Sequence, residues 1–143
     1  MNWCERLKTA AWTALVLAVG AGCEPGYVKT TTQFAARVKS VVSPEALQAW
    51  ATNLIAKTTI PASAPVEVKQ ADIPKALRGL YPYPPDADIV GPPGSATAHI
   101  EVWYGSGSGH WGLYIGGSTF VMCSSKTHYV VPWKQGVYFW NGP

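Results

Sequence analysis

Three histidines and one cysteine in the C-terminal half of this chain could bind a metal: His99, His110, Cys123 and His128. Four residues separate Cys123 from His128, which is not one of the usual spacings of paired zinc ligands. No second close pair completes a four-ligand set. The sequence therefore predicts no metal site, and nothing in it indicates a cofactor.

Three carboxylates in the same half, Asp86, Asp88 and Glu101, could form an acid and base pair of the kind that hydrolyses glycosidic bonds. The two aspartates follow a proline-rich turn, where Asp side chains commonly bond to nearby backbone amides. We therefore expect both aspartates to stabilise that turn, and no catalytic residue is assigned.

Aromatic side chains offer a different kind of site. Trp103, Tyr114 and Tyr138 alternate away from the expected core of their strands. Flat rows of aromatic rings bind sugars or peptides, and exposed apolar patches mark interaction sites. These three residues are therefore a candidate binding face. The alternative is that the long loop at residues 61–70 covers part of this face.

Two alternating stretches must position these residues. Apolar and polar residues alternate from His99 to Tyr104, and the alternation resumes at residues 110–116 after a Gly-Ser-Gly-Ser-Gly loop. This period of two predicts a β-hairpin. A further strand is expected before the hairpin at 87–90. Short turns lead from the hairpin to strands at 119–123, 129–133 and 137–140, so that about five strands form an antiparallel meander.

Helical periodicity precedes the strands. Ser43 is a typical N-cap, Pro44 suits the first helical position, and a stripe follows at Leu47, Trp50, Ala51, Leu54 and Ile55. Weaker patterns predict helices at 32–42 and 72–80. With two or three N-terminal helices packed on the meander, the fold class is α+β.

The N-terminal segment has the composition of a secretory signal. Arg6 and Lys8 precede a charge-free apolar run at residues 9–19, and three small residues lead to Cys23. The pattern resembles the bacterial lipoprotein signal, in which the peptide is cut before the cysteine and the cysteine receives the lipid. The sequence departs from that family at Gly20, where a larger aliphatic residue is usual. An ordinary secretory signal is the alternative.

This resemblance, which covers only residues 1–23, implies a signal peptide at residues 1–22 and an anchor at Cys23, with a short tether to residue 31. The length of the remaining chain predicts a single domain at 32–143. It also implies that lipid on Cys23 holds an exported protein at a membrane. Glu24, rather than Asp, follows the cysteine. In Gram-negative lipoproteins this favours the outer membrane, facing the periplasm, or the cell surface.

His110 opens the stretch His-Trp-Gly-Leu-Tyr-Ile-Gly. The stretch resembles the strand that carries the catalytic histidine of NlpC/P60 cell-wall cysteine peptidases, which implies a general base at His110 and a hydrolase as the alternative function. Those enzymes present a thiolate at a helix start upstream of the histidine. Only Cys4 and Cys23 precede His110, and Cys123 falls on an expected strand. We therefore favour a structural role for His110.

Three other segments, at residues 73–82, 111–115 and 136–140, resemble motifs found together in a group of small uncharacterised bacterial proteins. The motifs include Trp-Gly-Leu-Tyr-Ile and Gly-Val-Tyr-x-Trp. They consist of aromatic, glycine and proline residues, which are typical of packing. The resemblance implies a shared α+β fold and no assigned activity.

The net charge of the chain indicates which class of partner is not expected. Without residues 1–22, nine Lys or Arg and seven Asp or Glu remain, a net charge of +2 with no basic stripe. Nucleic acid is therefore not an expected partner. Cys123, the only cysteine beyond Cys23, is expected to be buried or to offer a route to a covalent dimer. The sequence predicts a lipid-anchored envelope protein, most simply a non-enzymatic binding domain for an envelope protein or glycan.

Overall fold

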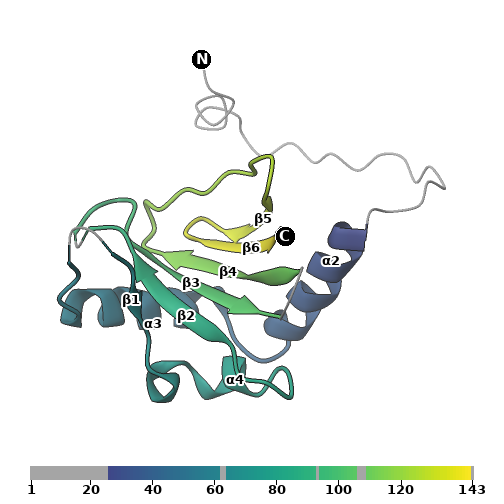
Figure 1. Cartoon of the computed structure of the whole chain (residues 1–143), viewed down its shortest axis with the longest axis horizontal. Coiled ribbons are helices and arrows are strands. Elements are labelled where there is room, and N and C mark those ends of the chain that lie inside the picture. The colour runs from purple at the N-terminus through teal and green to yellow at the C-terminus, as the bar shows by residue number, and fades with distance from the viewer. Residues whose placement is uncertain (1–25, 62–63, 93, 106–108, 143) are drawn as a thin grey trace.

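The computed structural model describes residues 26–61, 64–92, 94–105 and 109–142. The expected signal peptide and Cys23 lie outside them. The described chain forms helices packed on a six-stranded antiparallel sheet, which confirms the α+β class (Figure 1). The helical elements are α2 (Gly26–Lys39), α3 (Pro44–Lys57), a 3₁₀ turn η1 (Gln70–Asp72) and α4 (Lys75–Arg78). The strands are β1 (Val66–Glu67), β2 (Asp86–Val90), β3 (His99–Tyr104), β4 (His110–Gly116), β5 (Tyr129–Lys134) and β6 (Val137–Gly142).

The helix predicted from the Ser43 cap is present as α3. The Ser43 hydroxyl accepts a hydrogen bond from the backbone N–H of Ala46 at 3.2 Å, which satisfies one of the unpaired amides at the helix start. Helix α2 begins earlier than predicted. Residues 26–31, expected to belong to the tether, are helical, and Thr31 is buried.

The predicted hairpin forms in the register that the alternation requires. Strand β3 pairs with β4 so that Ile100 lies opposite Ile115 and Val102 opposite Leu113. The sheet is not the five-stranded meander that was predicted. It has six strands in the order β1-β2-β3-β4-β6-β5, so the last strand inserts between β4 and β5.

The prediction of a strand at 119–123 is wrong. Residues 117–128 instead form an irregular segment, here called the cover segment, that joins β4 to β5. Phe120 folds back onto the sheet because Gly116 has no side chain; a Cβ there would collide with the phenyl ring. The Tyr138 hydroxyl donates a hydrogen bond to the Phe120 carbonyl at 3.0 Å and fixes the segment in place.

The sheet is therefore covered on two sides. On the inner face, α2 and α3 bury the main core, which includes Phe34, Leu47, Ile100, Leu113 and Phe139. On the outer face, the cover segment buries a smaller aromatic core of Tyr114, Phe120, Tyr138 and Trp140. Apolar side chains from both faces of β4 thus leave water, which is the main favourable contribution to folding.

Gly112 is the position in β4 with the least space. It lies opposite Trp103 in β3 and Trp140 in β6, and a Cβ there would collide with the backbone carbonyl of Val102. Because that obstacle is backbone, the strands would have to separate to admit a methyl group.

We expect Gly112→Ala to lower the free energy of unfolding by about 2–3 kcal/mol through overpacking. Urea denaturation followed by circular dichroism measures this. Gly109→Ala is the matched control, since no atom lies within 4 Å of a Cβ at that position. Equal stability of the two variants would contradict the close approach of β3 to Gly112.

Candidate functional site

A groove of about 490 Å³ lies where the β3–β4 hairpin meets the loop that follows α4. Its volume is in the range of small-ligand and peptide side-chain sites. Proline and glycine backbone forms part of the wall, and Asp86 contributes a carboxylate. The aromatic lining residues are Tyr81, Tyr83, Trp103, Tyr104 and Trp111.

Local structure holds this lining in place. The Tyr104 hydroxyl donates a buried hydrogen bond to the Leu77 carbonyl at 2.9 Å and so ties the end of β3 to α4. Burial also raises the pKa of Tyr104, which therefore stays protonated as the donor. Gly105 has a φ of +101°, and a Cβ there would meet the Trp111 indole. Glycine thus lets the chain turn tightly against that ring.

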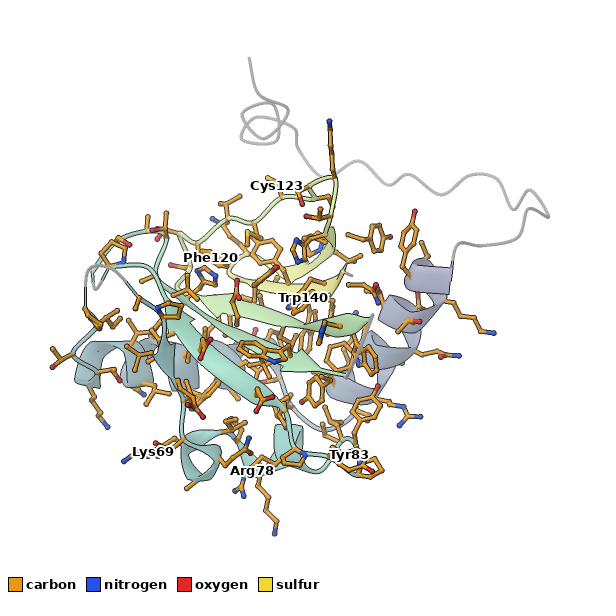
Figure 2. All side chains as sticks on the ribbon, in the orientation of Figure 1. Lys69, Arg78, Tyr83, Phe120, Cys123 and Trp140 are labelled. Carbon is orange, nitrogen blue, oxygen red and sulfur yellow. The ribbon has the colours of Figure 1, made fainter. Side chains whose placement is uncertain are left out.

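The rings of the groove differ in what they already contact. Tyr81 packs against Tyr104 and Trp111 with ring centroids 5.3 and 5.8 Å away, and the Arg37 guanidinium lies 5.2 Å from the Tyr81 centroid. Tyr83 is 82% exposed on its proline-rich loop (Figure 2). Trp103 is half-buried. Tyr83 and Trp103 therefore have ring surface available for a ligand.

The groove borders an acidic part of the outer face. Asp86 is exposed and lies directly opposite Trp103. Two residues further along β2, Asp88 lies opposite both Glu67 in β1 and Glu101 in β3. These three in-register carboxylates are here called the acidic row. Like charges directly opposite one another destabilise a sheet.

The electrostatics of the row follow from this register. Partial burial raises the pKa of Asp88, and the charges of Glu101, Glu67 and Asp86 raise it further. His99, which is buried, approaches the other end of the row. Its Nδ1 lies 2.7 Å from the Thr97 carbonyl and its Nε2 lies 3.5 Å from Glu101. The ring stacks on Phe120 with centroids 4.5 Å apart, so packing and hydrogen bonding fix its orientation.

The three residues of the predicted binding face are placed differently. Trp103 lines the groove, whereas Tyr114 and Tyr138 are only 4% and 5% exposed. Burial raises the pKa of Tyr114 to about 12. The cover segment, rather than the loop at 61–70, provides the aromatic core around these two tyrosines. Trp103, Tyr114 and Tyr138 therefore do not form one exposed row.

His110 and Cys123 lie apart from the groove lining. His110 begins β4 opposite Gly142, and its Nδ1 is buried with no hydrogen-bond partner in the described chain. Cys123 is exposed on the cover segment, contrary to the expectation that it is buried, and is disulfide-bonded (Figure 2). The other cysteines of the sequence, Cys4 and Cys23, lie outside the described residues.

A second cavity, of about 330 Å³, lies beside residues 124–129 and the end of β6. Its hydroxyl groups are engaged locally. The Ser125 hydroxyl accepts hydrogen bonds from the backbone N–H groups of Thr127 and His128, and the Ser124 hydroxyl bonds to the backbone of Val130. These contacts shape the loop and leave the aromatic groove as the stronger candidate.

Sequence reasoning named Trp103 and Asp86 separately, for different roles, and missed the other lining residues of the groove. Its lining comes from a loop and from both faces of the hairpin, so no single periodicity unites it. The available signal was the run Tyr81-Pro-Tyr-Pro-Pro85. Prolines restrict such a run to extended turns, which holds Tyr83 away from the core.

Comparison with protein families, curated proteins and solved structures finds no match for this chain. None of the described helices is long and apolar enough to cross a membrane. Within the same residues, no group of three or more His, Cys, Asp or Glu side chains is arranged to hold a metal ion.

We expect Asp88→Asn to raise the free energy of unfolding at pH 7 by ~0.5 kcal/mol, because it removes a partly buried charge that also faces two other carboxylates. The raised pKa means that folded Asp88 takes up a proton before unfolded Asp88 as the pH falls. The gain from the substitution should therefore shrink as the pH falls through the raised pKa, and vanish below the ordinary value of 3.8.

Urea denaturation at a series of pH values tests this. Asp72→Asn, the same change at an exposed carboxylate in η1, should leave stability unchanged. If Asp88→Asn still has a higher free energy of unfolding than the wild type at low pH, the charge of Asp88 is not the cause of the difference.

Proposed function

We propose that this chain is an exported, lipid-anchored protein of the cell envelope whose domain is a non-enzymatic binding module, with the aromatic groove as its ligand site. The observation that carries the proposal is the groove itself: five aromatic residues and one carboxylate around about 490 Å³. Ligand sites typically combine apolar and aromatic walls with a few polar groups that orient the ligand.

The rings of Tyr83 and Trp103 are more available to a ligand than the other rings of the groove, which pack within the fold. Tyr83 makes little contribution to either core, since most of its surface is exposed. Trp103 packs at the edge of the outer core and presents the remainder of its indole to the groove. A ligand that covered these rings would remove apolar surface from water, which favours association.

Export is supported by the N-terminal sequence and by Cys123. A charged start, an apolar run and small residues before Cys23 are typical of a secretory lipoprotein. Disulfides persist in oxidising compartments such as the periplasm and the cell surface, so the bonded state of Cys123 supports export, but it does not support the lipid on Cys23.

The alternative function, a cell-wall hydrolase with His110 as base, requires a thiolate beside the imidazole. Cys123 lies on the irregular cover segment and not at the start of a helix, where those enzymes present their thiolate. No observation on the described residues supplies another nucleophile to His110, so we propose the binding module alone.

The binding proposal predicts that the full chain sediments with purified peptidoglycan sacculi, and that Tyr83→Ala and Trp103→Ala each reduce the bound fraction at least about fivefold through lost ring contacts. Sedimentation followed by quantitative blotting measures this. Tyr27→Ala is the control, because Tyr27 is also an exposed tyrosine but lies on α2 outside the groove.

Tyr83→Ala should unfold at the wild-type temperature, which separates lost binding from lost folding. The proposal fails if the wild-type chain does not sediment with sacculi, or if both groove variants sediment as the wild type does.

The anchor proposal predicts a mature chain that begins at Cys23 and carries two or three acyl chains, and that Cys23→Ser lacks them. Intact mass spectrometry of the protein from bacterial membranes measures this. A thioether on Cys23 consumes its sulfur, and cleavage before Cys23 removes Cys4. The mature chain therefore cannot carry both the lipid and an intrachain disulfide to Cys123.

Alkylation before and after reduction distinguishes these two states. An unlipidated chain whose Cys123 reacts with iodoacetamide only after reduction would contradict the anchor. A chain that is cut near Cys23 would still be exported.

A further inference from the structure

The geometry points to a cationic ligand. We propose that the groove binds a basic peptide, with a lysine or arginine side chain against the rings of Tyr83 and Trp103 and with Asp86 as its counter-ion. This rests on the proposed function, in which the groove is the ligand site, and it specifies the chemistry of the ligand.

The aromatic lining suits a cation. Ammonium and guanidinium groups are attracted to the faces of Trp and Tyr rings within about 6 Å of the centroid. The chain already uses this interaction at the groove, where the Arg37 guanidinium lies 5.2 Å from the centroid of Tyr81. The rings of Tyr83 and Trp103 offer the same attraction to a side chain from a second molecule.

Asp86 is the only Asp, Glu, Lys or Arg among the lining residues of the groove, while the Arg37 guanidinium lies against the ring of Tyr81. Among the described residues, the only Lys or Arg nitrogen within 4.0 Å of a carboxylate oxygen is Nζ of Lys134, which lies on Glu45. No Lys or Arg nitrogen of these residues therefore lies that close to Asp86, Asp88 or Glu67. A cleft lined by one sign of charge attracts ligands of the opposite sign.

The register of β2 favours a peptide over a single small amine. Asp86 and Asp88 are two residues apart on the same face of β2, a spacing of about 6.5–7 Å in an extended strand. An extended peptide presents alternate side chains at the same spacing. One cation can therefore enter the groove at Asp86 while the next lies over Asp88 and Glu101.

A neutral glycan would also contact the rings but would gain nothing from the acidic row. An anionic ligand would be repelled by Asp86 and by the row. The opposed carboxylates of the acidic row destabilise the free sheet. A bound cation relieves this repulsion, so its free energy of binding is more favourable there than at an isolated carboxylate.

Calorimetric titration of the full chain tests the inference with three probes: acetyl-(Lys-Ser)₃-amide, acetyl-(Gln-Ser)₃-amide and chitotetraose. We expect that, of the three probes, only the lysine peptide binds, and that added salt raises its Kd. Asp86→Asn should raise its Kd at least about fivefold, and Tyr83→Ala should act similarly. Glu45→Gln, which removes one exposed negative charge on α3, should change the Kd less than about twofold.

The other outcomes are distinguishable. If sacculi are retained through Tyr83 and Trp103 but the lysine peptide does not bind, the cation inference is overturned and the binding module stands. Binding of chitotetraose instead of the lysine peptide would assign the groove to a glycan. If Asp86→Asn and Glu45→Gln change the Kd of the lysine peptide equally, the attraction comes from the net charge of the protein. The groove is then not the binding site of the peptide. If Tyr83→Ala and Trp103→Ala sediment with sacculi as the wild type does, the proposed function fails, whatever the result of the peptide titration.

Discussion

Burial of β4 on both faces is the constraint on which the rest of the structure depends. Leu113 and Ile115 face the helices, while Tyr114 faces the cover segment. Gly112 lets β3 approach β4 closely by leaving room for the Val102 carbonyl, and Gly116 lets the cover segment approach by leaving room for Phe120. The positions of β3 and β6 beside β4, and hence of the groove at the end of the hairpin, follow from this packing.

The outer face is divided into two halves with opposite physical character. Its β4–β6 half is aromatic and lies under the cover segment, whereas its β1–β3 half carries the acidic row. Trp103 stands at the boundary, with the outer core on one side and the groove with Asp86 on the other. Opposed carboxylates lower stability, and such local costs are common where a surface serves a ligand.

The elements with strong local signals could be predicted from the sequence. The Ser43 cap and the apolar stripe specify α3, and the alternation around residues 99–116 specifies the hairpin and its register. The position of β6 in the sheet could not be predicted. Strand β6 pairs with β4 as well as with β5, and local sequence patterns do not specify a pairing between strands so far apart in the chain. Residues 119–123 have strand composition, yet Phe120 is more stable against the outer core. The groove was missed because loop and strand residues meet there only after folding.

The strand order also sets the sequence of events by which the chain becomes compact. Strand β5 has no neighbour in the sheet other than β6, and Phe139 of β6 packs against Phe34 of α2 with ring centroids 5.9 Å apart. Helix α2 therefore packs on the last described strand, and closing so long a loop costs entropy. The sheet is therefore complete only when β6 has paired with both β4 and β5.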